Sequence, residues 1–487
     1  MTSTPEPMAR LSTGSAEFDR ILGGGIPVRS LNVIAGEPGA GKTLFALQML
    51  FRLARAGQRG IYFTTLSEPS LKLLGYMRQF AFFDARLATE QVSFADLGSL
   101  LRTKGADAAL ADITSRVERD SPAIVIIDSF KALREGLVEA PVVRRFVYDL
   151  AVHSASWGAA SLLVGEYTDS EIAHNAEFAI ADGIIRFTHQ RHELSATREV
   201  EVLKLRGADY ATGRHFFDIG ASGLDFFARV RGPDAGVAEP AWGAERVPTG
   251  VGGLDEMLDG GLPRTTTTVV QGGTGTGKTL LGLRFLLEGA RRGEAGIHFT
   301  LEETAEQLRG IAANLGWDLR ALEDSGLLTL RYVSPIELST DRFLDQARRE
   351  VARVGARRAV VDSLTSLALG VPSERRYNEL VYAMTKHLRA LGVTLVMNLE
   401  IADLLGSAQL SGHGISFAAD NVILLKYVER DGRLERGLAV LKARGVSHAT
   451  DVRSLTLSAT GIDVAPAYTG LRGVLTGLPL ADRREES

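Results

Sequence analysis

The sequence predicts an α/β protein of two tandem domains, each a mainly parallel twisted sheet flanked by helices. In both halves, apolar runs of strand length alternate with longer stretches of helical period, which is typical of a parallel sheet covered by helices. A glycine-rich loop of the pattern G-x-x-x-x-G-K-[ST] occurs twice, at 36–43 and 272–279. Thr13-Gly14 ahead of the first loop returns at the same offset as Thr249-Gly250 ahead of the second. This repetition indicates the duplication of a whole domain.

The chain of 487 residues is long enough for two such domains, each able to bury a core of its own. A stretch rich in glycine, proline and alanine at 231–243 is interpreted as the linker between them. We therefore expect an N-terminal domain at 1–230, a C-terminal domain at 244–475 and a charged tail at 476–487.

The expected strands follow the same order in both halves. Those of the first half are 31–35, 60–65, 92–97, 123–128, 161–166 and 183–187. Those of the second half are 266–271, 296–301, 327–333, 358–362, 393–400 and 421–427. Each half then ends in two strand-like segments, at 198–205 and 215–227 and at 437–443 and 452–464.

Composition excludes several classes of protein. No apolar run approaches the ~20 residues that span a bilayer, and residues 1–10 are polar without an apolar signal core, so we expect a cytoplasmic protein with no membrane role. The chain has no cysteine, which excludes disulfides and cysteine-ligated metal sites. Its 55 basic and 59 acidic residues give a net charge of −4, so nucleic acid is not an expected partner.

Each glycine-rich loop lies between a predicted strand and a predicted helix, where backbone N–H groups and the helix N-terminus converge on phosphate. The glycines let the backbone wrap the phosphates of ATP, the lysine neutralises their charge, and the threonine hydroxyl reaches Mg²⁺. The residues predicted to bind ATP are Gly36, Gly39, Gly41, Lys42 and Thr43 in the first loop and Gly272, Gly275, Gly277, Lys278 and Thr279 in the second.

An acidic residue at the end of a later strand should complete each Mg²⁺ site. Asp128 ends the apolar run 123–127, Asp362 ends a shorter apolar run, and a serine follows each of them. We predict that Asp128 with Thr43, and Asp362 with Thr279, hold the metal, usually through water.

Hydrolysis of ATP also needs a carboxylate that orients or deprotonates the attacking water. The second half has Glu302-Glu303 directly after a predicted strand, whereas the first half has Ser67-Glu68 there and so lacks one carboxylate of the pair. We predict Glu302, Glu303 and Glu68 as catalytic residues, with unequal sites and turnover mainly in the second domain.

A third repeat is Lys204-Leu205-Arg206 against Lys442-Ala443-Arg444. Alternation along a strand places the lysine and the arginine of each repeat on one face. In a ring of subunits, these cations could reach the γ-phosphate of a neighbouring subunit, and we count them among the predicted ATP-binding residues.

Together these motifs resemble the KaiC-like proteins, which are double-domain members of the RecA superfamily of P-loop nucleoside triphosphatases. The resemblance covers nearly the whole chain. It rests on the two loops, Glu302-Glu303, Asp362-Ser363, the run 423–428, and Lys442 with Arg444. It implies two RecA-like domains, a homo-hexameric two-tier ring with ATP between adjacent subunits, slow ATPase activity, and Ser/Thr autophosphorylation in the second tier. A KaiB-like or other signalling protein is the partner that it implies.

The chain departs from the family pattern in three places. Ser67 replaces the first carboxylate of the N-terminal pair, which puts normal hydrolysis there in doubt. The family's adjacent Ser-Thr phosphorylation pair aligns with Ser416-Phe417, which leaves Ser416 as the candidate acceptor and Ser411 as an alternative. The C-terminal tail is short compared with clock members, where it docks the KaiA activator. We therefore interpret the chain as a KaiC-like regulator outside the full clock.

Two other classes of function stay open. A DNA-acting motor or recombinase shares the fold, but the absence of cysteine excludes the zinc module of RadA-like proteins and the negative net charge disfavours the rest of this reading. A non-catalytic nucleotide-gated signalling scaffold would bind through both loops, yet it would not need Glu302-Glu303. The mass of the purified protein with and without ATP, combined with phosphate release, distinguishes the three.

Overall fold

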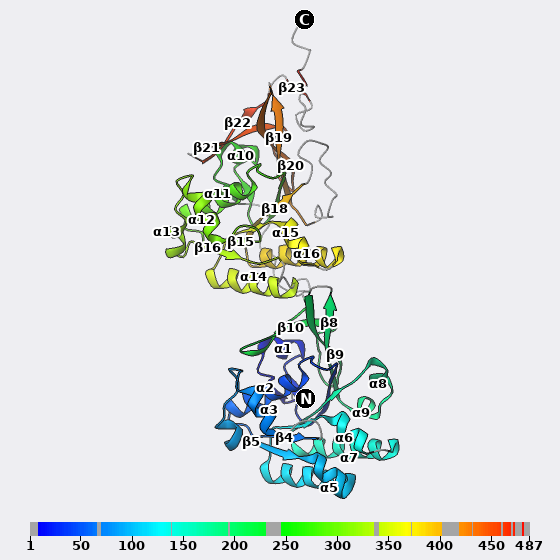
Figure 1. The fold of residues 1–487 in the computed structure, drawn as a ribbon. Helices are drawn as coiled ribbons and strands as arrows, with labels where there is room; N and C mark the ends of the chain where they lie inside the picture. Colours follow the sequence, from blue (N-terminus) through cyan, green and yellow to red (C-terminus); the bar gives the residue numbers. More distant parts are fainter. Residues whose placement is uncertain are drawn as a thin grey trace, which may run out of the picture. The chain divides into compact units, whose positions relative to one another are not determined.

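The computed structural model shows two compact units, Met1–Arg229 and Val230–Ser487 (Figure 1). The described residues are 8–65, 70–137, 139–192, 195–229, 245–335, 340–371, 373–401, 418–430, 432–458, 461–468, 471–472 and 480–481. The predicted linker 231–243 lies outside them, and so does most of the predicted tail, of which Leu480–Ala481 is described as a short strand.

The first unit is built on a nine-stranded sheet in the order β11-β10-β9-β8-β3-β7-β6-β4-β5. The strands from β8 to β5 are parallel, and β9, β10 and β11 extend the sheet by antiparallel pairing. The strand bounds are β3 (Leu31–Gly36), β4 (Gly60–Thr64), β5 (Val92–Asp96), β6 (Ile124–Asp128), β7 (Ala160–Glu166), β8 (Gly183–His192), β9 (Ser195–Leu205), β10 (Arg214–Gly220) and β11 (Gly223–Phe227), beside the small pair β1 (Arg10–Leu11) and β2 (Ile26–Pro27).

The second unit repeats this sheet in the corresponding order, β16-β15-β17-β18-β14-β19-β20-β21-β22. Its strand bounds are β14 (Thr267–Gly272), β15 (Gly296–Thr300), β16 (Leu328–Tyr332), β17 (Arg358–Asp362), β18 (Thr394–Glu400), β19 (Asn421–Arg430), β20 (Arg433–Ala443), β21 (Arg453–Ser458) and β22 (Gly461–Ala467), with the small pairs β12 (Arg246–Val247) with β13 (Leu262–Pro263) and β23 (Leu471–Arg472) with β24 (Leu480–Ala481). The predicted α/β class, with two mainly parallel sheets in tandem, is confirmed.

Two segments that were each predicted as one strand-like run contain two strands. Segment 215–227 holds β10 and β11, and segment 452–464 holds β21 and the start of β22. Gly223 and Gly461, which open the second strand of each pair, have φ angles of 104° and 126°. Glycine adopts these angles without the clash that a Cβ atom brings, so glycine suits the first position of each second strand.

Alternation along the parallel strands gives each sheet two apolar faces. In the first unit, Ile34 and Ile126 pack with α2 on one face, and Val33 and Val125 pack with α5 and α7 on the other. The helices of the first unit are α1 (Ala16–Ile21), α2 (Lys42–Arg55), α3 (Ser70–Met77), α4 (Leu87–Glu90), α5 (Leu97–Asp120), α6 (Phe130–Gly136), α7 (Ala140–Trp157), α8 (Asp169–His174) and α9 (Ala176–Ile180).

The second sheet is covered in the same way. Val270 and Val360 face α11, whereas Val269 and Val361 face α14 and α16. The helices of this unit are α10 (Gly252–Met257), α11 (Lys278–Arg291), α12 (Ala305–Ala313), α13 (Leu319–Asp324), α14 (Thr340–Val354), α15 (Leu364–Leu369) and α16 (Glu374–Ala390).

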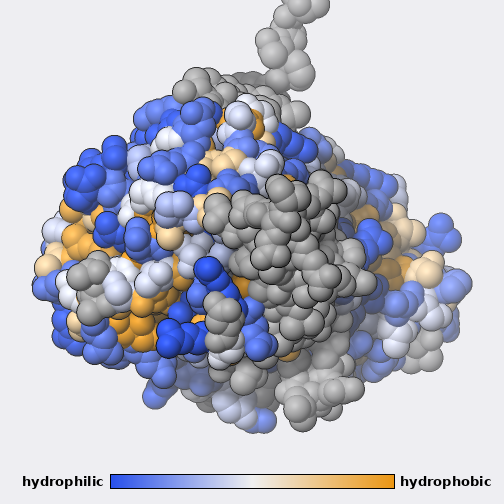
Figure 2. Space-filling model, turned by 90° about the horizontal axis from the view of Figure 1, so that it is seen from above, coloured by the Kyte–Doolittle hydropathy of each residue, from blue (hydrophilic) through white to orange (hydrophobic). Residues whose placement is uncertain are grey.

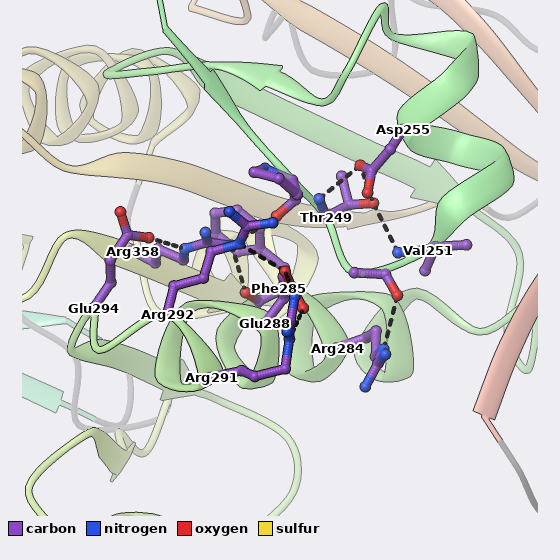
Figure 3. A network of polar contacts seen from close by, with 12 residues as sticks. Thr249, Val251, Asp255, Arg284, Phe285, Glu288, Arg291, Arg292, Glu294 and Arg358 are labelled. Atoms are coloured by element: carbon purple, nitrogen blue, oxygen red, sulfur yellow. Dashed lines mark hydrogen bonds and ion pairs between the residues drawn. The ribbon is translucent and has the colours of Figure 1, made fainter.

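A buried arginine ties the start of the second unit to its sheet (Figure 3). Arg358 on β17 is 1% exposed, and its guanidinium group lies over the Phe285 ring. It donates to Glu294 Oε2 at 2.7 Å and to the backbone carbonyl oxygens of Pro248 and Phe285 at 2.7 and 2.9 Å. The first unit has Ile124 at the corresponding strand position, so this ionic contact belongs to the second unit alone.

Hydrophilic residues cover much of the described surface in the view of Figure 2, with apolar residues in scattered patches between them. Leu369, Leu434 and Tyr148 are the most exposed of the large apolar side chains, at 80%, 66% and 60%. Among the described residues, no helix has both the length and the apolar character that crossing a membrane requires.

Candidate nucleotide sites

Each glycine-rich loop joins a parallel strand to the helix that begins at its lysine. β3 ends at Gly36 and α2 begins at Lys42, while β14 ends at Gly272 and α11 begins at Lys278. Both loops therefore lie at the carboxyl end of their sheet and beside a helix N-terminus, which is where an anion binds.

The backbone of the loops has a shape that glycine adopts more readily than other residues. Gly41 and Gly277 precede the two helices in a left-handed conformation, with φ angles of 96° and 106°. A Cβ atom on Gly36 would lie 2.0 Å from the carbonyl oxygen of Phe187, so a larger residue would displace the loop from β8. These loops fit the cradle that a triphosphate needs.

Both loop lysines are buried and fold over their own loop. Lys42 Nζ donates to the carbonyl oxygen of Glu37 at 2.6 Å, and Lys278 Nζ donates to those of Gly272 and Gly273, each at 2.9 Å. Burial lowers the pKa of Lys42, and the charges of three nearby carboxylates oppose this shift. An ammonium group at this place is suited to neutralise phosphate charge.

The predicted metal residues of the first unit meet one another. Thr43 Oγ1 donates to Asp128 Oδ2 at 2.6 Å, and the Tyr62 hydroxyl donates to the same oxygen at 2.7 Å. Burial raises the pKa of Asp128, while these two hydrogen bonds oppose the shift. A hydroxyl and a carboxylate suit Mg²⁺, which prefers oxygen ligands. Tyr62 was not among the predicted site residues. A tyrosine inside an otherwise apolar strand is the sequence feature that could have indicated it.

The corresponding residues of the second unit lie on the same elements. Asp362 ends β17 and is 2% exposed, and Thr279 is the second residue of α11, as Thr43 is of α2. Asp362 Oδ2 has no hydrogen-bond partner among the described residues. An orphaned, buried carboxylate oxygen beside a loop of this kind fits a ligand of a metal ion or of its water.

The predicted general base Glu302 is held by two serines. Ser363 Oγ and Ser366 Oγ donate to Glu302 Oε1 at 2.5 and 2.6 Å. Ser363 follows Asp362 directly, and Ser366 lies one helical turn later on α15, so the carboxylate is oriented beside the metal residue. The Asp-Ser pair was noted in the sequence, but Ser366 was not predicted as a site residue. Its spacing of three residues after Ser363 was the only sequence feature that could have indicated it.

Glu303 is half-buried and lies close to two other carboxylates. Burial raises the pKa of Glu303, and the charges of Asp362 and Glu302 act in the same direction while Lys278 opposes them. Its Oε2 atom has no hydrogen-bond partner among the described residues. A carboxylate of this kind is suited to proton transfer nearer to neutral pH than an ordinary glutamate.

The first site opens into a cavity of about 800 Å³. Its lining includes the polar residues Lys42, Thr43 and Asp128 and the apolar and aromatic side chains Leu73, Tyr76, Met77 and Phe80. A cavity of this size lies within the range of small-molecule sites.

Five of the residues discussed above lie outside the described part of the chain. They are Ser67, Glu68, Ser411, Ser416 and Phe417. The catalytic role of Glu68 and the acceptor role of Ser416 therefore stay predictions.

The repeated cations lie at the end of each sheet that is opposite to the loops. Lys204 on β9 pairs with Ile184, the second residue of β8, and its Nζ atom donates to the carbonyl oxygen of Ala179, ahead of that strand. Arg206 pairs with Asp182 at 3.3 Å. The second unit repeats this arrangement. Lys442 Nζ donates to the Ala419 carbonyl oxygen at 2.6 Å, and the guanidinium group of Arg444 lies 3.6 Å from the Asp420 carboxylate.

The comparison with known families agrees with this geometry. The model of the KaiC ATPase family matches residues 11–231 and again residues 247–469, which together cover most of the chain. The chain belongs to the KaiC family of ATPases. It is 29% identical to the circadian clock oscillator protein KaiC of Acaryochloris marina over 97% of this chain and 91% of the relative. It is 28% identical to the circadian clock protein KaiC3 of Synechocystis over 98% of this chain and 96% of that relative.

Two carboxylates that the sequence analysis missed stand at the loops of this KaiC-family chain. Glu166 and Glu400 end β7 and β18, the strands beside β3 and β14. Glu400 Oε1 accepts a hydrogen bond from Thr274 Oγ1 at 2.8 Å, and its Oε2 lies 3.8 Å from Lys278 Nζ. A strand that ends in glutamate in both halves was the signal that could have found them.

Proposed function

We propose that this KaiC-family chain is an ATP-hydrolysing regulatory protein that forms a two-tier homo-hexameric ring in the cytoplasm, with Mg-ATP held between neighbouring subunits. Turnover would come mainly from the second domain. The names of the relatives, which are circadian clock proteins, support a regulatory role. A KaiB-like or other signalling protein is the partner that we propose.

One observation supports the proposed ring assembly. The loops stand at the carboxyl end of each parallel sheet, whereas Lys204, Arg206, Lys442 and Arg444 engage groups at the amino end. A long cation that points away from its own loop can act on phosphate only in a neighbouring molecule. Head-to-tail contacts of this kind close into rings when the rotation between subunits allows it.

The chemistry follows from the residues of the second site. Mg-ATP, when bound, supplies the γ-phosphoryl group and the metal charge. The loop amides and Lys278 would bind the phosphates, and Thr279 and Asp362 would hold the metal. Glu302, oriented by Ser363 and Ser366, would accept the proton of the attacking water. Lys442 and Arg444 of one subunit would stabilise charge at the site of the next, as arginine fingers do.

Assembly is tested by multi-angle light scattering of the full chain with and without saturating Mg-ATP. We expect a particle of six subunits with nucleotide and a smaller species without it, because nucleotide completes the interface. Lys442→Ala combined with Arg444→Ala should keep nucleotide binding by the loops and lower phosphate release. A monomer at saturating Mg-ATP would overturn the ring.

Autophosphorylation is a separate part of the proposal. If the second domain transfers phosphate to its own chain, we expect Ser416 to be the acceptor, because Phe417 offers no hydroxyl beside it. Phosphopeptide mass spectrometry after incubation with Mg-ATP, on the wild type and on Ser416→Ala, tests this. Phosphate that persists in the variant would move the assignment to another residue such as Ser411.

A further inference from the structure

Buried polar side chains flank the metal carboxylate of the second site. His298 on β15 and Asn398 on β18 are both 0% exposed, and β17 with Asp362 runs between these two strands. Neither ring nitrogen of His298 and neither side-chain polar atom of Asn398 has a hydrogen-bond partner among the described residues. Asp362 Oδ2 shares this state. Buried polar atoms without partners are rare in folded proteins, so a group of them needs a physical explanation.

The sheet register places these side chains on one face. Thr300 pairs with Asp362, so His298 lies two residues behind that level on the neighbouring strand. Val361 pairs with Met397, which brings Asn398 level with Asp362 on the other side. This face packs on α11, since a Cβ atom on Gly282 would lie 3.0 Å from Val360 and 3.8 Å from Asn398. The group therefore lies between the sheet and the helix that follows the loop.

The first unit orients its metal carboxylate without a group of unpaired polar side chains. Tyr62 occupies the position of His298, and its hydroxyl donates directly to Asp128 Oδ2 at 2.7 Å. Val164, which pairs with Asp128, occupies the position of Asn398 and is 1% exposed. The metal carboxylate of the first site thus receives a direct hydrogen bond from β4 and has an apolar neighbour on β7.

We propose that His298 and Asn398 form a buried water site of the second domain, in which ordered water links both side chains to Asp362 and orients its carboxylate for the metal. Water supplies the donors and acceptors that the protein does not, and a buried water usually makes about three hydrogen bonds to polar groups of this kind. His298 and Asn398 are positioning residues, because they act on the metal through water and Asp362. This inference rests on the proposed nucleotide site.

The consequence is that Mg²⁺ binding at the second site depends on His298 and Asn398. Loss of a group that orients a metal ligand typically weakens metal binding about tenfold to a hundredfold. Replacing His298 by leucine or Asn398 by valine should raise the Mg²⁺ concentration needed for half-saturation of the second site by that factor. Binding of nucleotide without Mg²⁺ should stay unchanged, because the loop itself is intact.

The test uses the full chain with Lys42→Ala, so that the second loop reports binding of a fluorescent ATP analogue. Mg²⁺ is titrated for this parent and for His298→Leu, Asn398→Val and His298→Gln, the last of which keeps a donor and an acceptor. We expect the two apolar variants to need more Mg²⁺ and His298→Gln to stay close to the parent. Equal Mg²⁺ requirements in all four proteins would overturn the water site.

Two further measurements test the water site independently of the Mg²⁺ titration. The apolar variants should still fold cooperatively, with a somewhat lower thermal midpoint than the parent, because each leaves the rest of the water site short of one hydrogen-bond partner. A crystal structure at high resolution should show water within hydrogen-bond distance of His298 or Asn398 and of Asp362, and a dry cluster would contradict the proposal. A wild-type chain that binds no nucleotide at all would overturn the proposed function and this inference together, whereas normal binding by the Lys42→Ala parent with equal Mg²⁺ requirements in its variants overturns only the inference.

Discussion

The contrast between Glu302 and Glu303 shows how neighbouring residues of one type acquire different chemistry. Glu302 accepts two serine hydroxyls, whereas Glu303 is half-buried and its pKa is raised by burial and by the charges of Asp362 and Glu302. The serine hydroxyls therefore orient Glu302, whereas burial and neighbouring charge raise the pKa of Glu303. We propose Glu302 as the general base, because a base must be held in reach of its water before its pKa matters.

Glu302→Gln should lower phosphate release about 10²- to 10⁴-fold, which is the range for loss of a positioned base. The amide keeps the shape of the side chain and cannot take a proton, so nucleotide binding should persist. Glu306→Gln is the matched control, because Glu306 is exposed and pairs only with surface arginines in the described contacts. Measurement of released phosphate distinguishes them, and a larger effect of Glu68→Gln would move the main engine to the first domain.

Glu302 itself was within reach of sequence reasoning, but its serine partners were not. The pair Glu302-Glu303 stands out because it follows an apolar strand directly. The contact with Ser366 depends on the close approach of the end of β15 to the start of α15, although Glu302 and Ser366 are 64 positions apart in the chain. Such approach follows from the pairing of β15 with β17, and a local pattern carries no record of it.

At the scale of elements, β17 shows how the two domains diverged within one architecture. Arg358 opens β17 where Ile124 opens β6, and its partner Glu294 stands where the first half has Gln58. The arginine is almost fully buried and satisfied by Glu294 and two backbone carbonyls. Removing one partner of such a buried ion pair lowers the free energy of unfolding strongly, whereas replacing both partners together often changes it little.

Arg358→Ile alone should destabilise the second domain by about 3–5 kcal/mol, because it leaves Glu294 Oε2 and the two carbonyl oxygens without this donor, although Glu294 Oε1 keeps its contact with Arg264. The double variant Arg358→Ile with Glu294→Gln, which introduces the residues of the first domain, should recover much of this loss. Urea unfolding followed by circular dichroism measures both. A double variant as unstable as the single one would show that the packing of the guanidinium group, and not its charge, matters.

The end of α11 predicts a response to acid (Figure 3). Hydrogen bonds from Arg291 lower the pKa of Glu288 to about 2 against the opposing effect of burial, and Arg292 adds to the lowering. A carboxyl whose pKa is lower in the folded than in the unfolded state stabilises the fold above the unfolded value, and this stabilisation is lost as the pH falls from there towards about 2. Glu288→Gln should therefore lose less stability than the wild type between neutral pH and about pH 4, as measured by urea midpoints. Equal losses would contradict this role.

At the scale of the whole molecule, the duplicated sheet gives one chain two loops at carboxyl ends and two cation pairs at amino ends. In the proposed ring, this polarity would let each subunit complete the sites of the next. It also separates the proposed ring from a monomeric nucleotide switch, whose sites would be complete within one chain.

DNA should bind weakly to the assembled protein and should not accelerate phosphate release. The net charge is −4, and a nucleic-acid groove needs a dense basic stripe, commonly with aromatic residues. Fluorescence anisotropy with single-stranded and duplex DNA at physiological salt tests this expectation. Tight binding together with faster hydrolysis would favour the DNA-acting motor instead.

The two loops, their helices, the strand segments along the chain and the positions of Asp128 and Asp362 follow from local patterns, because periodicity and glycine spacing are properties of short segments. The side-chain contacts between these elements do not follow from local patterns. The bond between Tyr62 and Asp128, the serines around Glu302, and the orphaned polar group of His298, Asn398 and Asp362 arise where strands far apart in sequence become neighbours in the sheet. Side-chain partners are chosen by register and burial, and these exist only once the sheet has formed.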